Sequence, residues 1–202
     1  MNKVRVAVLA SGEGTNAAAL IQYERTTKDC PYKVVCVITN KPNAGVLRVS
    51  EEYSVPSFFI SFDKRDETDI AKDVLMHLGA CGAEFICLAG FLRKIPSELL
   101  QVFKEKIINI HPSLLPKYGG KGMYGKNVFQ AVLEGKEAVT GVTIHAVSAE
   151  YDEGAIIYSE RIGIDEDETV NSLAEKTKRV EHRVYPEVLA AECGRIRQIS
   201  PI

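Results

Sequence analysis

The sequence predicts an α/β protein with a doubly wound, mostly parallel sheet, an antiparallel C-terminal strand pair and a long closing helix. Three observations predict this fold. Short apolar runs rich in β-branched residues alternate with segments of helical period along the first half of the 202-residue chain. These runs are too apolar for half-exposed strands, as in a parallel sheet that helices cover on both faces. The connections between them are short, as in right-handed strand–helix–strand units.

The first half carries five runs of strand length, with four segments of helical period between them. The predicted strands span residues 4–10, 33–39, 56–60, 84–88 and 107–110. The predicted helices span about residues 16–24, 44–53, 67–78 and 97–103. The third helix has the clearest pattern, because its apolar residues form one stripe and Gly79 follows as a stop signal.

The pattern changes after Pro116. A glycine-rich loop at residues 117–125 precedes a predicted helix near 127–134. Two further strands, at 141–148 and 155–162, are expected to form a hairpin-like pair. The second half of the chain therefore departs from the strand–helix–strand repetition of the first.

A long helix closes the predicted fold. It begins at about Thr169, is interrupted or bent at Pro186, and ends near Gly194. The chain contains no internal repeat, no low-complexity stretch and no linker that would divide it. We therefore expect residues 1–202 to form a single domain.

Composition and charge exclude several classes of function. Twenty-five basic and 27 acidic residues give a formal net charge of −2, so bulk charge should not drive nucleic-acid binding. No apolar run approaches the roughly 20 residues of a membrane helix, and the N-terminus lacks a signal-peptide cleavage pattern. The five cysteines form no C-x-x-C pair, which favours reduced, buried thiols in a cytoplasmic protein. No group of His, Cys or carboxylate residues has metal-ligand spacing, so no metal is expected.

The segment SGEGTN at residues 11–16 lies between the first strand and the first helix. Its glycines allow a tight turn, and the helix N-terminus offers N–H groups to an anion such as a phosphate. Asn16 stands where a dinucleotide-binding fingerprint needs its third glycine, and the lysine of a P-loop is absent. The alternative is a plain turn in which Thr15 or Asn16 is the helix N-cap. Glu13 argues mildly against a phosphate unless its side chain points outward.

Asn109 and His111 begin the segment NIHPSLLP at residues 109–116. The period of a strand puts both side chains on one side, and Pro112 holds His111 in extended backbone at the strand end. Ligands bind at the carboxyl ends of parallel strands in open α/β sheets. An amide donor beside an imidazole suits acyl transfer, because one stabilises an oxyanion while the other donates or moves a proton. The alternative is a histidine that only hydrogen-bonds a turn.

Asp152, between the last two predicted strands, is a candidate partner for His111. A carboxylate near the imidazole would orient the ring and raise the pKa of His111 above its ordinary value of ~6.5. The alternative is a solvated acidic residue. His145 lies within an alternating strand and is interpreted as a structural histidine, and His77 and His182 lie in helices without special spacing.

Glu181 lies at the border of an apolar stripe on the last helix. The stripe consists of Leu173, Ala174, Thr177, Val180, Val184 and Val188. A carboxylate in that position needs a cation or hydrogen-bond donors. A substrate amine or hydroxyl would serve, and so would a nearby Lys or Arg. The residues alone slightly favour the second, structural alternative.

The order of these motifs resembles that of the phosphoribosylglycinamide formyltransferases, a branch of the folate-dependent formyltransferase superfamily. The likeness rests on the loop at 11–16, on LAGFLR at 88–93, on NIHPSLLP at 109–116, on the Asp152 loop and on EHRVYP at 181–186. It covers essentially the whole chain. The segment at 109–116 with a downstream Asp is typical of the superfamily, and the N-terminal phosphate loop narrows the likeness to this branch.

The resemblance implies a Rossmann-like fold and one reaction of purine synthesis. The formyl group of 10-formyltetrahydrofolate, a co-substrate, would pass to the amine of phosphoribosylglycinamide. The implied catalytic residues are Asn109, His111 and Asp152. The implied residues for the substrate phosphate and ribose are Gly14, Thr15, Asn16 and Glu181. The implied folate-binding residues are Arg65, Leu92, Arg93, Lys94, Ile95, Asn109, Ser148, Ala149, Glu150, Tyr151 and Asp152.

The resemblance also implies how the chain is organised. Residues 1–106 would form the phosphate- or nucleotide-binding half, and residues 107–202 the catalytic and folate-binding half. Both partners would be small molecules, with no nucleic acid, no membrane and no metal. The protein would be a cytoplasmic monomer or homodimer.

Three departures from the family pattern bear on these expectations. Glu13 stands where relatives often have Asn, and Lys178 stands where they often have Gln three residues before the helix glutamate. Lys178 would pair with the substrate phosphate or be solvated. The loop at 117–125 is longer and richer in glycine than in many relatives, which suits either a lid or a solvated surface loop.

Three other functions compete with this interpretation. A methionyl-tRNA formyltransferase is expected to carry a further C-terminal domain and a basic surface, and this chain is net acidic. A formyltetrahydrofolate deformylase usually has a regulatory domain before its first strand, which here begins at Val4. A folate- or nucleotide-binding module without turnover would not need Asn109, His111 and Asp152 together.

Overall fold

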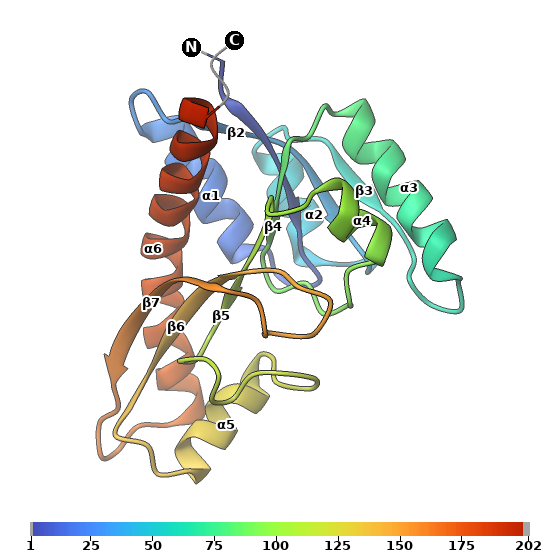
Figure 1. Ribbon diagram of the computed structural model, residues 1–202. Helices are drawn as coiled ribbons and strands as arrows, with labels where there is room; N and C mark the ends of the chain where they lie inside the picture. The colour runs from blue at the N-terminus through green and yellow to red at the C-terminus, as the bar shows by residue number, and fades with distance from the viewer. Residues whose placement is uncertain (1, 200–202) are drawn as a thin grey trace.

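The computed structural model describes residues 2–199, which form a seven-stranded sheet and six helices (Figure 1). The strands are β1 (Val4–Leu9), β2 (Tyr32–Thr39), β3 (Ser57–Phe59), β4 (Phe85–Leu88), β5 (Ile107–His111), β6 (Val139–Ala146) and β7 (Ile156–Gly163). The helices are α1 (Thr15–Thr26), α2 (Gly45–Glu52), α3 (Glu67–Ala80), α4 (Ser97–Val102), α5 (Lys126–Glu134) and α6 (Val170–Ile199). None of these helices is long and apolar enough to cross a membrane.

The sheet has the strand order β3-β2-β1-β4-β5-β6-β7. Strands β1 to β5 pair in parallel, whereas β6 pairs antiparallel with both β5 and β7. This order confirms the predicted doubly wound, mostly parallel sheet with an antiparallel C-terminal pair. The strand order reverses at β1, since β2 and β3 lie on one side of it and β4 and β5 on the other. Open α/β sheets bind ligands at such a switch point, beyond the carboxyl ends of the strands.

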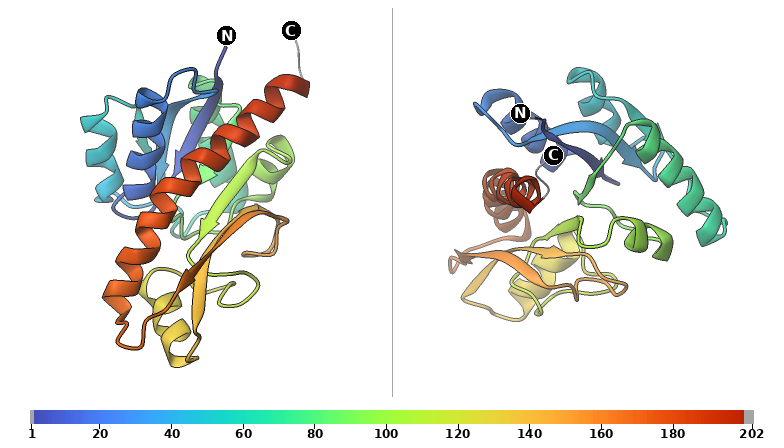
Figure 2. Two further views of the ribbon diagram at one scale, coloured as in Figure 1. Left: turned by 90° about the vertical axis from the view of Figure 1, so that its left-hand side faces the viewer. Right: turned by 45° about the horizontal axis from the view of Figure 1, so that its top comes forward.

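Helices cover both faces of the sheet, and β1 illustrates how the sequence specifies the two layers. Val6 and Val8 pack in one core with α1, α2 and α6, whereas Ala7 and Leu9 pack in a second core with α3 and α4. All four side chains are fully buried. Successive residues of a strand point to opposite faces, so a strand covered on both faces is apolar throughout. Figure 2 shows α6 on one side of the sheet and α3 on the other.

Helix α6 differs from the prediction at both of its expected break points. It continues through Pro186 and Gly194 to Ile199, so of the two alternatives at Pro186 the interruption is wrong, and the predicted end near Gly194 is wrong as well. Proline removes one backbone N–H from the helix ladder, but apolar burial on the sheet outweighs that loss. Tyr185 is fully buried and its hydroxyl donates to the Leu88 carbonyl, 2.9 Å away. This contact fixes α6 against the carboxyl end of β4.

Most other predicted elements are confirmed to within a few residues. Strand β6 begins earlier than expected, at Val139, and ends at Ala146, so Ser148 lies in the loop that follows. The five cysteines are free, and four of them are buried as predicted, while Cys81 is half-exposed. The fold thus places three loop segments together beyond the carboxyl ends of β1, β4 and β5.

Candidate active site

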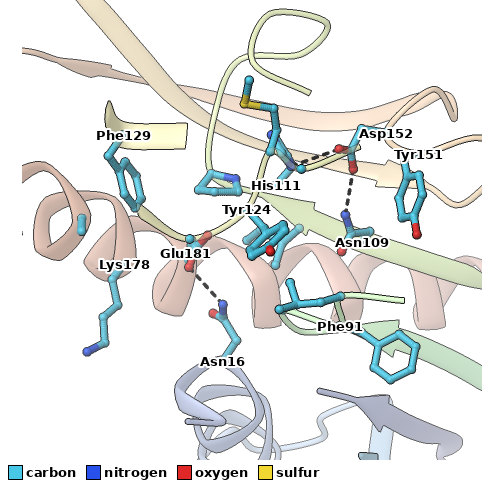
Figure 3. Close-up of a pocket in the computed structure, with 18 of the residues that line it drawn as sticks. Asn16, Phe91, Asn109, His111, Tyr124, Phe129, Tyr151, Asp152, Lys178 and Glu181 are labelled. Carbon is cyan, nitrogen blue, oxygen red and sulfur yellow. Dashed lines mark hydrogen bonds and ion pairs between the residues drawn. The ribbon is translucent and has the colours of Figure 1, made fainter. Parts of the chain in front are cut away.

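A cleft of about 620 Å³ opens beyond the carboxyl ends of the central strands. Its walls come from the first residues of α1, the loop after β4, the end of β5, the glycine-rich loop, the loop before β7 and one face of α6 (Figure 3). Six polar residues in these walls were expected at the site from the sequence, namely Thr15, Asn16, Asn109, His111, Asp152 and Glu181. Residues far apart in the sequence therefore face one cavity.

The end of β5 presents Asn109 and His111 to this cleft, as the strand period predicts. Ile108 packs in the core beneath α1 and α6, and Ile110 packs there too but also lines the cleft. His111 is 4% exposed, and its Nε2 lies 2.7 Å from the Tyr118 carbonyl oxygen. A carbonyl oxygen only accepts hydrogen bonds, so Nε2 carries the hydrogen.

The second ring nitrogen of His111, Nδ1, lies 3.5 Å from Asp152 Oδ2. Asp152 does act to raise the pKa of His111, but the expected net rise above the ordinary value is wrong. Burial lowers the pKa of His111 below its ordinary value, because desolvation of the imidazolium outweighs the attraction of Asp152. Nε2–H therefore donates to Tyr118, while Nδ1 faces the Asp152 carboxylate.

Asp152 lies at the centre of a cluster of polar side chains that it forms with Asn109, His111 and His145. Its Oδ2 accepts a hydrogen bond from the Gly120 N–H at 2.9 Å, and its Oδ1 lies 3.4 Å from Asn109 Nδ2 and 3.5 Å from His145 Nε2. Burial alone would raise the pKa of Asp152, yet His145, His111 and the Gly120 N–H together hold it below its ordinary value. Asp152 is therefore an ionised carboxylate between two imidazole rings, rather than a solvated loop residue.

His145 belongs to the same cluster. Its interpretation from the sequence as a structural histidine did not predict that it contacts Asn109 and Asp152. It is 2% exposed, its Nδ1 donates to the Ala146 carbonyl at 2.9 Å, and its Nε2 lies 3.1 Å from Asn109 Nδ2. The signal that identifies it is the antiparallel register, in which His145 stands directly opposite Asn109. That register is not readable from the sequence.

The start of α1, at Thr15 and Asn16, forms the other end of the cleft. Gly14 is the N-cap of α1 with φ +79°, and α1 has no side-chain cap, so the alternative of Thr15 or Asn16 as N-cap is wrong. A Cβ at Gly14 would lie 2.6 Å from Val46 Cα, so the close approach of α2 requires glycine. Glu13 points away from the cleft and pairs with Arg48 on the surface. The N–H groups at this helix start are therefore available to an anion, with no carboxylate facing them from Glu13.

Glu181 on α6 faces the same end of the cleft. Its Oε2 accepts a hydrogen bond from Asn16 Nδ2 at 3.0 Å. Burial raises the pKa of Glu181 to about 7, although the Asn16 amide and the Lys178 charge oppose the shift. Lys178 also lines the cleft and pairs at 3.5 Å with Glu175. Asn16 and Glu181 thus join the first and last helices across the floor of the cleft.

A smaller cavity of about 60 Å³ adjoins the cleft on the side of Asp152. Most of the residues expected at a folate site line it, namely Arg93, Lys94, Ile95, Asn109, Ser148, Ala149, Glu150, Tyr151 and Asp152. Lys94 and Glu150 form an ion pair of 3.2 Å between its two walls. Leu92 lines the larger cleft instead.

Gly14, at the N-cap of α1, lines neither cavity, and neither does Arg65. Its guanidinium pairs with Asp73 at 2.7 Å and donates to the carbonyls of Ser61 and Asp69. Over residues 2–199, no three His, Cys, Asp or Glu side chains are grouped as metal ligands. The glycine-rich loop contributes Lys121, Met123 and Tyr124 to the cleft wall, which is compatible with the lid interpretation and does not test it.

An ionised carboxylate, two imidazoles and an amide meet at the carboxyl end of β5, opposite a helix N-terminus that has no side-chain cap. Fold and site together define an α/β enzyme of the group-transfer class. Comparison with known protein families gives a narrower result, since the model described as "Formyl transferase" matches residues 4–189. The chain belongs to the formyl transferase family.

Individual relatives agree with this assignment. The trifunctional purine biosynthetic protein adenosine-3 of Gallus gallus is 40% identical over 93% of this chain, and the chain spans 18% of that protein's length. The phosphoribosylglycinamide formyltransferase of Haemophilus influenzae is 32% identical over 92% of this chain and 85% of its own. A crystal structure of phosphoribosylglycinamide formyltransferase from Bacillus halodurans matches with a TM-score of 0.86 at 35% identity, over 93% of this chain and 94% of its own.

Proposed function

We propose that this enzyme transfers the formyl group of 10-formyltetrahydrofolate to the amine of 5′-phosphoribosylglycinamide, giving formyl-phosphoribosylglycinamide. One observation carries the proposal. A single cleft joins an uncapped helix N-terminus, which suits a phosphate, to Asn109, His111 and Asp152, which suit acyl transfer. The Haemophilus and Bacillus relatives, both phosphoribosylglycinamide formyltransferases, support the same substrate.

The chemistry begins when the neutral amine attacks the formyl carbon. The oxyanion of the resulting tetrahedral intermediate receives hydrogen bonds from His111 Nε2–H and from the Asn109 amide hydrogen that points toward Asp152 Oδ1 in the structure. Nε2–H donates in the structure to the Tyr118 carbonyl, so the oxyanion takes the place of that carbonyl. The Asp152 carboxylate lies 3.5 Å from Nδ1, where its charge favours the imidazolium. The amine loses a proton and the leaving folate nitrogen gains one, a transfer that we assign to Asp152 through water.

The phosphate binds at Gly14, Thr15 and Asn16, where the start of α1 offers N–H groups and the helix dipole favours negative charge. Glu181 accepts hydrogen bonds from the ribose hydroxyls. Its hydrogen bond from Asn16 holds this carboxylate beside the phosphate-binding start of α1. This arrangement directs the glycyl amine of the substrate toward Asn109 and His111. The folate is held between the loop after β4 and the loop before β7, around the smaller cavity.

The test is a spectrophotometric assay of the purified protein with 10-formyltetrahydrofolate and phosphoribosylglycinamide, with each omitted in turn. Cofactor conversion that requires the amine acceptor is the expected result. Conversion without the acceptor would identify water as the acceptor and a deformylase instead. Saturable folate binding without conversion would identify a binding module. A cytoplasmic location and a monomeric or homodimeric state belong to the same proposal.

A further inference from the structure

Ser11 joins three segments of the chain through one buried side chain. It is 2% exposed and follows β1 at the strand switch point. Its hydroxyl donates to Asn40 Oδ1 at 2.5 Å and accepts a hydrogen bond from the Leu92 N–H at 2.9 Å. Its own N–H donates to the Gly90 carbonyl at 3.1 Å. The segments that leave β1, β2 and β4 are therefore tied together at Ser11.

The segments that Ser11 joins carry the two ends of the active site. Residues 12–16 continue from Ser11 to the start of α1, and the Gly12 carbonyl accepts a hydrogen bond from the Val46 N–H at 3.1 Å. Residues 90–93, which follow β4, line the cleft on the side of the smaller cavity. Ser11 itself does not line the cleft, so it does not touch substrate.

The hydroxyl of Ser11 uses its one hydrogen toward Asn40 and a lone pair toward the Leu92 amide. Alanine at this position removes both bonds and leaves the Leu92 N–H without its partner. The loop at 90–93 then has no side-chain link to the loop at 11–16. Only the backbone hydrogen bond from Ser11 N–H to Gly90 remains between them.

We propose that Ser11 is a positioning residue that sets the distance between the phosphate-binding loop and the folate-facing loop. The proposal rests on the function proposed above, in which one loop anchors the amine and the other the formyl donor. A displacement of about 1 Å between two reacting groups costs about 10²-fold in rate, whereas the binding of each substrate uses contacts local to its own loop. Ser11 therefore affects the rate of the bound complex more than it affects binding.

The first test compares Ser11→Ala with Ser50→Ala. Ser50 is also fully buried, but its hydroxyl donates to the Val46 carbonyl within α2 and joins no two loops. We expect Ser11→Ala to lower kcat about 10- to 100-fold with KM for each substrate changed less than about threefold. We expect Ser50→Ala to keep kcat. If Ser11→Ala raises KM and leaves kcat unchanged, the positioning role is wrong.

Asn40→Ala provides a second variant, because it removes one of the two bonds of Ser11. Asn40→Ala should also lower kcat, but by a smaller factor than Ser11→Ala does. The double variant Ser11→Ala with Asn40→Ala should be no slower than Ser11→Ala alone. Fully additive losses would contradict a role of both residues in one link.

A readout that does not depend on turnover separates this proposal from the proposed function. Hydrogen exchange followed by mass spectrometry reports on the Leu92 amide, which we expect to exchange faster in Ser11→Ala than in the unchanged protein and in Ser50→Ala. An unchanged exchange rate would overturn the proposal even where the parent protein transfers formyl groups. Absence of amine-dependent transfer by the parent would overturn the proposed function, while the exchange result still decides whether Ser11 ties the loops.

Discussion

Asn109 Nδ2 on β5 lies 3.1 Å from His145 Nε2 on β6, and the two residues face each other directly across the antiparallel strand pair. His145 Nδ1 donates to the Ala146 carbonyl, so Nε2 accepts a hydrogen from the Asn109 amide. That hydrogen bond fixes which end of the amide carries the hydrogens. It also directs the second hydrogen toward Asp152 Oδ1 at 3.4 Å. His145 thereby orients a group that the proposed reaction uses as an oxyanion donor.

Replacement of His145 by phenylalanine keeps a ring in the strand but removes the acceptor for the Asn109 amide. We expect turnover to fall about 10-fold, less than the ~10²–10³ that removal of an oxyanion donor costs, because the amide stays present but loses its orientation. Steady-state kinetics of His145→Phe, Asn109→Ala and the double variant check this. The double variant should match Asn109→Ala, and fully additive losses would contradict the orienting role.

Loss of either member of the His111–Asp152 pair should abolish most of the activity and leave the fold intact. We expect His111→Ala and Asp152→Ala each to cut turnover by at least ~10², since one supplies a donor to the oxyanion and the charge of the other favours the imidazolium. Glu153→Ala is the matched control, because Glu153 is an exposed carboxylate in the same loop. Circular dichroism checks the fold of all three variants, and steady-state kinetics gives their kcat. Near-parental turnover of either His111→Ala or Asp152→Ala would overturn the catalytic assignment.

The fold was predictable because local patterns determine it. The alternation of Val6 and Val8 with Ala7 and Leu9 specifies a strand covered on both faces, whatever its neighbours are. The candidate site was predictable where it lies within one segment, as Asn109 and His111 do by strand period. Asp152 and Glu181 are candidates from their residue types, but no local rule brings them to the cleft, and only the family resemblance assigned them to one site.

The remaining features depend on tertiary contacts that a sequence does not display. His145 faces Asn109 because of the β5–β6 register, which turn geometry and packing determine. The pKa of His111 falls rather than rises because its burial exceeds what a strand end suggests. Helix α6 passes Gly194 because Leu189 and Cys193 are buried on the sheet, which outweighs a local stop signal.

Glu181 makes the stability of the protein depend on pH. Burial raises its pKa from 4.5 to about 7, so the folded state binds the proton more tightly than the unfolded state. This contribution to stability is fully present below pH 4.5 and is lost as the pH rises toward and through 7. Glu181→Gln mimics the protonated form, so its melting temperature relative to the parent should be higher at pH 8 than at pH 5. An equal difference at both pH values would show that Glu181 does not titrate in this range.

Thr177 on α6 offers a stabilising substitution outside the cleft. Its side chain is fully buried, and its hydroxyl finds no hydrogen-bond partner within residues 2–199. Thr177→Val keeps the shape and removes the unpaired hydroxyl, so it should stabilise the protein by about 1 kcal/mol and raise Tm by about 2–4 °C. Thr143→Val is the matched control, because that equally buried hydroxyl accepts from the Leu115 N–H and donates to the Ser113 carbonyl. It should lower Tm, and a loss of stability in both variants would mean that Thr177 has a partner after all.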